Sequence, residues 1–209
     1  MAPERIGIFG GSFNPIHNGH LTLARTVCDA MALDRLIFIP AGFPPHKPFA
    51  ELAEAEHRYA MVRLAARTDT RFQVSRLELD SPETSYTVTT MRAFRSLFTP
   101  EDQLFFVMGA DSLVDLINWR SFGELAQLCT FAAAARPGVS RETLAAHLTL
   151  LEGKYGARIS LVPMVPQPIS ASEIRERVSR GESIDDLVPP GVAAYIEAHG
   201  LYRSDYGSK

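Results

Sequence analysis

The feature that most constrains the fold of this 209-residue chain is a regular alternation of short apolar runs with amphipathic segments. Six apolar runs have the length and composition of β-strands. The first, second and fourth do not alternate apolar with polar residues, which indicates strands buried on both faces of a sheet. The six runs cover residues 5–9, 35–41, 72–79, 103–109, 130–135 and 158–164.

Helical patterns separate these runs, and two more follow the last of them. Strands and helices in alternation imply an α/β fold. We therefore expect a doubly wound, Rossmann-like parallel sheet of about six strands, with helices on both faces and a C-terminal helical segment, and a ligand beyond the carboxyl ends of the strands. The expected helices start near Asn18 and then cover roughly 54–67, 85–98, 111–128, 140–154, 171–180 and 190–199.

Composition limits the number of domains, the binding partners and the cellular compartment that we expect for the protein. The length fits a single domain over residues 1–209, with a flexible tail over 203–209. The net charge of −3 argues against a nucleic acid held by bulk electrostatics. No apolar run approaches ~18 residues, so no membrane span is expected. Because Cys28 and Cys129 lie in apolar surroundings and no secretory h-region is visible, we expect a cytoplasmic protein with reduced thiols.

The segment GGSFNPIHNGH, residues 10–20, follows the first expected strand. Gly10 and Gly11 would let the backbone turn tightly and approach a ligand. His17 and His20 are three residues apart around a helix start, so they share one face of its first turn. Open N–H groups and the helix dipole would favour a phosphate there, and two imidazoles would add donors. The glycines match neither GxGxxG nor a P-loop, and HxxH alone offers too few ligands for zinc.

A second segment, ISASEIR at residues 169–175, opens a helix late in the chain. Ser170 and Glu173 form the S-x-x-E pattern of a capping box, which predicts a helix that begins at Ala171. Arg175 follows in the next turn, where its guanidinium could reach an anion near the helix start.

These two segments resemble the HxGH and ISxTxxR signatures of the nucleotidyltransferase superfamily, with Ser172 where threonine is more usual. The resemblance implies a nucleotidyltransferase domain that uses ATP, with His17, His20 and Arg175 as catalytic residues. His20 would bind the α-phosphate, and His17 and Arg175 the departing β- and γ-phosphates. Mg²⁺ would be held mainly by phosphates and water, with no metal site on the protein. The implied ATP-binding residues are Gly10, Gly11, Ser12, Phe13, His17, His20, Gly109, Asp111, Ile169, Ser170, Ser172 and Arg175.

Further stretches extend the resemblance over nearly the whole chain: PPHK, SYT, GAD, the single tryptophan, ARPG and LVPPGVAAYIEAHGLY. Together they are similar to the bacterial nicotinate-nucleotide adenylyltransferase family, which adenylates nicotinate mononucleotide with ATP and releases pyrophosphate in NAD biosynthesis. The family commonly has an aspartate two residues after SYT, where this chain has Thr89. Lys47 would then hold the acceptor phosphate and Trp119 would stack on the pyridine ring. The implied acceptor-binding residues are His46, Lys47, Ser85, Tyr86, Thr87, Trp119 and Arg136.

The sequence leaves alternatives open. An adenylyltransferase of the same superfamily could act on nicotinamide mononucleotide or phosphopantetheine, and a nucleotide-binding sensor could use the same fold without catalysis. A homo-oligomer is compatible with the sequence. Because SPETSYT and GADSLVDLINW contain no arginine or lysine, we expect main-chain N–H groups near Ser85 and Trp119 to bind the acceptor's carboxylate.

Overall fold

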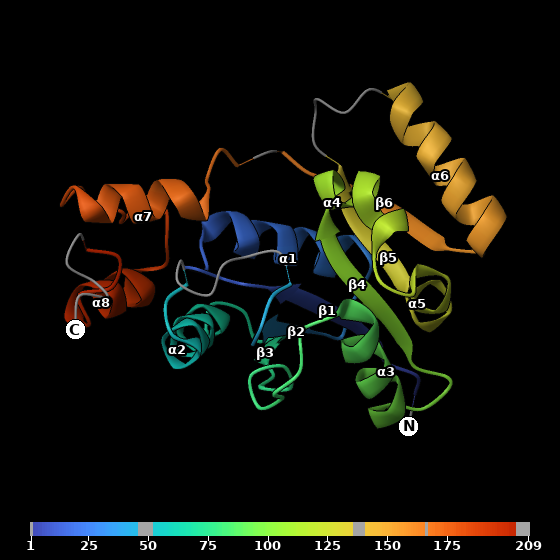
Figure 1. Ribbon diagram of the computed structural model, residues 1–209, viewed down its shortest axis with the longest axis horizontal. Coiled ribbons are helices and arrows are strands. Elements are labelled where there is room, and N and C mark those ends of the chain that lie inside the picture. Colours follow the sequence, from blue (N-terminus) through green and yellow to red (C-terminus); the bar gives the residue numbers. More distant parts are fainter. Residues whose placement is uncertain (1, 46–51, 136–140, 166, 204–209) are drawn as a thin grey trace. The chain divides into compact units, whose positions relative to one another are not determined.

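The computed structural model of the protein describes residues 2–45, 52–135, 141–165 and 167–203. Its strands form one six-stranded sheet in the order β3-β2-β1-β4-β5-β6 (Figure 1). The chain builds outward from β1 to β3, then continues from the other side of β1 with β4, β5 and β6. This doubly wound order confirms the predicted fold class. The strands are β1 (Arg5–Gly11), β2 (Arg35–Pro40), β3 (Phe72–Val74), β4 (Gln103–Gly109), β5 (Thr130–Ala135) and β6 (Arg158–Pro163).

The helices lie where the apolar periodicity predicts them, with one exception over residues 111–128. Among the described residues, no helix is both long enough and apolar enough to cross a lipid bilayer. The helices are α1 (Asn18–Ala30), α2 (Ala55–Ala66), α3 (Thr87–Leu97), α4 (Ala110–Asp115), the 3₁₀ helix η2 (Leu116–Asn118), α5 (Phe122–Leu128), α6 (Arg141–Tyr155), α7 (Ala171–Ser179) and α8 (Pro190–Ala198).

The chain divides into two compact units, each built from segments far apart in sequence. The first unit comprises Met1–Gly10, Leu23–Ile37 and Ser85–Pro166, and the second comprises Gly11–Thr22, Phe38–Thr84 and Gln167–Lys209. The single domain over 1–209 stays a prediction. Of the expected tail, only Arg203 falls within the described residues.

In the first unit, β4 pairs in parallel with β1 and β5, and β5 pairs with β6. Ile6 and Ile8 are fully buried and the residues between and after them are buried or nearly so, as expected for a strand covered on both faces. Helices α3 and α5 pack together, and Arg92 of α3 forms a two-pronged ion pair with Glu124 of α5. Cys129, before β5, is buried and free, and burial raises the pKa of its thiol to about 12.

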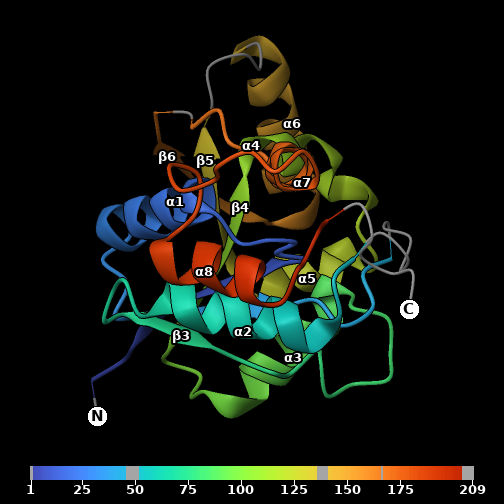
Figure 2. The same ribbon diagram turned by 90° about the vertical axis from the view of Figure 1, so that its left-hand side faces the viewer.

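In the second unit, α2 packs against α8 (Figure 2). The prediction of a strand over residues 72–79 is wrong at its carboxyl end, because β3 stops at Val74. The Ser75 N–H donates to the carbonyl of Phe38, and the Ser75 Oγ then accepts the N–H of Leu77 at 3.2 Å. This local side-chain hydrogen bond turns the chain out of the extended conformation.

The helix predicted over 111–128 is wrong at its centre, where the chain forms three pieces: α4, η2 and α5. The Trp119 N–H donates to the carbonyl of Leu116, three residues back, which ends the 3₁₀ turn. Ser121 then adopts a left-handed conformation with φ of 54°. A residue with that φ cannot continue a right-handed helix, so α5 begins anew at Phe122. The break places Trp119 and Arg120 outside regular structure.

Candidate active site

The first motif leaves the carboxyl end of β1. Gly10 and Gly11 still belong to this strand, so the tight turn predicted at the glycines is wrong. The reversal comes at Phe13, whose φ is 44°. A Cβ on Gly11 would lie only 3.0 Å from the Phe13 ring, so the glycine lets that ring fold back against the strand end.

His17 and His20 lie together at the start of α1, as the spacing predicts. Their rings stack with centroids 3.7 Å apart, and the edge of the buried Phe13 ring supports His20 at 5.2 Å. The His17 N–H donates to Nδ1 of His20 at 3.3 Å. Because Nδ1 is the acceptor, the proton of the neutral His20 ring resides on Nε2. His20 is half-buried.

One expectation about this helix start is wrong. The Asn18 N–H does not stay open for a phosphate, because it donates to the carbonyl of Leu187 at 2.9 Å. The Asn18 side-chain amide also donates to the Asp186 carbonyl, which fixes the segment before α8 to the motif. A Cβ on Gly19 would lie 3.1 Å from Nδ1 of His17, so a larger residue there would press on the His17 ring.

The second motif comes to the first within the second unit. Ser170 caps α7 by accepting the N–H of Glu173 at 3.1 Å, so the predicted cap and the start of the helix at Ala171 are confirmed. The Glu173 carboxylate accepts from Arg177 one turn later, at 2.9 Å. Arg175, in the next turn, donates from Nη1 to the main-chain carbonyl of Asn14 at 2.9 Å. Its Nη2 donates to Oγ of Ser172 at 3.3 Å, which gives that hydroxyl a positioning role.

Asn14 connects the motif loop to two other segments of the second unit. Its buried Oδ1 accepts the N–H of Ala53 at 3.0 Å and the hydroxyl of Tyr202 at 2.9 Å. Its main-chain carbonyl accepts Arg175. One short loop residue therefore joins segments from the beginning, middle and end of the chain.

Arg58 of α2 is a site residue that sequence reasoning missed. Its side chain is fully buried, and burial lowers its pKa. Its Nε donates to the carbonyl of Ala53 at 3.0 Å, and its Nη1 donates to those of Ser12 at 2.9 Å and Ala41 at 2.7 Å. These hydrogen bonds connect the guanidinium to the loop of the GGSFNPIHNGH segment and to both ends of the loop that follows β2.

The only sequence signal for Arg58 is its place on the helix. It lies three and four residues before the buried Met61 and Val62, on the apolar face of α2. A single arginine in an amphipathic helix is usually solvated, so this position could not be distinguished from the sequence alone.

The predicted acceptor residues of the first unit surround the start of α3. The half-buried Trp119 packs its edge on Phe106 of β4 with centroids 5.7 Å apart. Tyr86 is the N-cap residue of α3, and its side chain makes no capping hydrogen bond. The guanidinium carbon of Arg120 lies 4.4 Å from the centre of the Tyr86 ring. This contact places the Trp119 segment beside the SYT segment.

Three predicted acceptor residues, His46, Lys47 and Arg136, lie outside the described residues, and so does the side chain of Asp111. The loop that leads to His46 passes Gly42, where a Cβ would lie 2.2 Å from the carbonyl oxygen of Glu78. Only glycine allows this close backbone approach.

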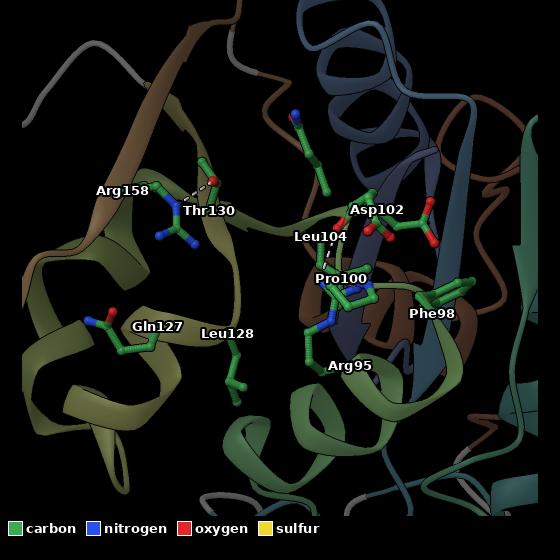
Figure 3. A pocket seen from close by; sticks show the side chains of 11 residues that line it. Arg95, Phe98, Pro100, Asp102, Leu104, Gln127, Leu128, Thr130 and Arg158 are labelled. Atoms are coloured by element: carbon green, nitrogen blue, oxygen red, sulfur yellow. Dashed lines mark hydrogen bonds between the residues drawn. The ribbon is translucent and has the colours of Figure 1, made fainter. Parts of the chain in front are cut away.

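Two large cavities in the described part of the chain lie away from these motifs. One has a volume of about 810 Å³ and lies at the amino ends of β4, β5 and β6. Figure 3 shows residues that line it, among them Arg95, Leu104, Gln127, Thr130 and Arg158. It opens at the strand ends opposite to Gly109 and contains none of the predicted site residues. A cavity of about 950 Å³ next to α7 and α8 contains none of them either. The site is therefore identified by its side chains rather than by cavity volume.

Comparison with known proteins identifies the family of the chain. A family model described as cytidylyltransferase-like matches residues 8–177. A Thermus thermophilus protein named "Probable nicotinate-nucleotide adenylyltransferase" is 47% identical over 201 residues, which cover 95% of this chain and all of that one. A Thermoanaerobacter protein of the same name is 40% identical over 96% of this chain and 95% of its own. Plasmodium falciparum nicotinic acid mononucleotide adenylyltransferase complexed with NaAD matches the fold with a TM-score of 0.77 at 20% identity, covering 99% of this chain and 100% of that one.

Proposed function

The chain belongs to the cytidylyltransferase-like family, and we propose that it transfers AMP from ATP to nicotinate mononucleotide, yielding nicotinate adenine dinucleotide and pyrophosphate. The observation that carries this proposal is the hydrogen bond from Arg175 to Asn14, which brings ISASEIR to GSFNPIHNGH beside the stacked His17 and His20. Relatives with 40% and 47% identity over nearly the whole chain bear the name of this activity.

The chemistry needs no covalent protein intermediate. An oxygen of the acceptor's phosphate attacks the α-phosphorus of ATP, and the bond from that phosphorus to the β-phosphate oxygen breaks. Catalysis then consists of positioning and of stabilising negative charge. His20 would donate its Nε2–H to the α-phosphate, where charge increases. The guanidinium of Arg175 has five N–H donors, so its bonds to Asn14 and Ser172 leave others for the β- and γ-phosphates, together with His17.

The acceptor would lie against the Trp119 ring, which is half-buried and fixed at its edge by Phe106. Ser85, Tyr86 and Thr87 would contact the pyridine carboxylate or the loop around it. Lys47 would hold the acceptor's phosphate. This assignment, like those of His46, Asp111 and Arg136, rests on the family resemblance.

We propose that Mg²⁺ arrives with ATP and neutralises phosphate charge. In the described part of the chain, no three His, Cys, Asp or Glu side chains gather to hold an ion. Phosphate oxygens and water suit Mg²⁺ well as ligands, so the fit does not require protein carboxylates. We also propose that the enzyme works in the cytoplasm, where the thiols of Cys28 and Cys129 would stay reduced.

The test is pyrophosphate release from ATP in the presence of nicotinate mononucleotide, nicotinamide mononucleotide or phosphopantetheine, with the product identified by mass. We expect rapid release with nicotinate mononucleotide and loss of that activity in His20→Ala. His199→Ala, which removes an exposed histidine of the second unit, is the matched control and should retain activity. Release with phosphopantetheine alone would overturn the acceptor assignment. ATP binding without release for any acceptor would indicate a sensor.

A further inference from the structure

Arg120 directly follows the Trp119 against which the acceptor ring would lie. Its side chain is exposed, and its guanidinium carbon lies 4.4 Å from the centre of the Tyr86 ring. A cation over the face of a tyrosine is attracted by the ring's quadrupole, which positions the charge without neutralising it. Arg120 therefore presents a positioned positive charge beside the N-cap residue of α3.

Two other arginines of the first unit already have partners within the protein. Arg92 forms an ion pair with both carboxylate oxygens of Glu124. Arg95 donates to the main-chain carbonyls of Thr99 and Asp102. Arg120, in contrast, forms no ion pair and no hydrogen bond with any residue in the described ranges. Its guanidinium is available to an anion from outside the chain.

The start of α3 adds donors at the same place. Tyr86 is the N-cap residue without a capping side chain, and the first turn contains no acidic residue. The main-chain N–H groups of Thr87 and Val88 donate to no group that the structure describes. The same holds for the N–H of Arg120. The helix end is electropositive. The Arg120 guanidinium therefore lies over the ring of a residue that is followed by open N–H groups.

We propose that Arg120 determines acceptor specificity by attracting the carboxylate of the nicotinate ring, and that nicotinamide mononucleotide is the poorer acceptor because its amide carries no charge. This inference rests on the proposed function and deepens it. It adds a side-chain cation to the main-chain N–H groups that we expect to bind the carboxylate, because Arg120 directly follows Trp119 in the sequence.

A purely structural role for Arg120 would have different consequences. If the guanidinium only held Tyr86 against the Trp119 segment, its loss would disturb every acceptor in the same way. If it attracts the carboxylate, its loss would selectively impair the charged acceptor. The ratio of kcat/KM for nicotinate mononucleotide to kcat/KM for nicotinamide mononucleotide distinguishes the two.

The experiment compares Arg120→Met and Arg120→Lys with wild type, at saturating ATP. We expect Arg120→Met to lower that ratio about tenfold through a higher KM for nicotinate mononucleotide, the size of losing one charge-assisted contact. Arg120→Lys should recover part of the ratio because the charge remains. Arg92→Met is the matched control: it removes an arginine whose charge is already paired, so the ratio should stay within about twofold of wild type.

A second measurement does not depend on turnover. Trp119 is the only tryptophan of the chain, so its fluorescence reports acceptor binding directly. Without ATP, the Kd of nicotinate mononucleotide should rise about tenfold in Arg120→Met. Tyr86→Leu, which removes the ring below the guanidinium, should shift the Kd in the same direction, and Tyr86→Phe should preserve the discrimination between the two mononucleotides.

The possible failures are distinguishable. If wild type transfers AMP to neither mononucleotide, the proposed function fails. If wild type prefers nicotinate mononucleotide and Arg120→Met keeps the same ratio and the same Kd, the proposed function stands and the role of Arg120 is refuted. Equal losses for both mononucleotides in Arg120→Met would also refute it, because they would indicate a structural role only.

Discussion

Replacing Arg58 with methionine should destabilise the protein and disturb its active-site loops together. The guanidinium donates to three main-chain carbonyls, and those of Ala41 and Ala53 belong to buried residues. Each buried acceptor left without a donor costs about 1–3 kcal/mol. Methionine avoids the desolvation of a buried charge, which offsets part of this cost. We expect the free energy of unfolding to fall by about 3 kcal/mol, a large share of the roughly 5–15 kcal/mol of a typical domain.

The assay is urea unfolding at 25 °C, followed by circular dichroism and paired with steady-state kinetics under folding conditions. Arg63→Met is the matched control, because Arg63 is an exposed arginine of the same helix, and its free energy of unfolding should change by less than about 0.5 kcal/mol. Arg58→Met should also raise KM for both substrates, since it releases the loops at Ser12 and Ala41. A loss below about 1 kcal/mol with unchanged KM values would refute the reasoning.

Three further predictions concern individual side chains. His20→Ala should lower kcat roughly 10²-fold or more with a smaller change in KM for ATP, and a near-normal kcat would remove His20 from the catalytic step. Lys47→Ala should raise KM for the mononucleotide far more than KM for ATP, and equal effects would move Lys47 to the triphosphate. Burial raises the pKa of Cys129 to about 12, so the folded protein should resist iodoacetamide at about pH 8.5 and the urea-unfolded chain should react, as measured by intact mass. The folded pKa is the higher one, so this thiol's contribution to stability is complete below the unfolded value of about 9 and is lost as pH rises toward 12.

The sequence predicted the parts of the fold that depend on burial. Ile6 and Ile8 lie in a strand without polar alternation, and both are fully buried in the middle of the sheet. The sequence failed where one side chain or one φ angle overrides periodicity. Ser75 ends β3 through its hydroxyl, and Ser121 breaks the helix after Trp119, although apolar spacing continues through both places.

The candidate site shows the same division. Motif spacing correctly predicted that His17 and His20 share a face and that Ser170 caps the helix of Arg175. It could not predict Arg58, because its role depends on main-chain carbonyls of two separate loops, at Ser12 and at Ala41 and Ala53. Nor could it predict the ring contact of Arg120, because residues 86 and 120 meet only through the packing of α3 and α5.

The bonds of Asn14 also order events during synthesis of the chain. Its carbonyl accepts a hydrogen bond from Arg175, which is synthesised 161 residues later, and its Oδ1 accepts one from the hydroxyl of Tyr202, 188 residues later. A ribosome that has made the HxGH loop must therefore translate as far as Tyr202 before that loop gains its last contacts. Nascent chains arrested before Tyr202 leaves the exit tunnel should contain both histidines but lack the hydrogen bond that joins Asn14 to the end of the second unit.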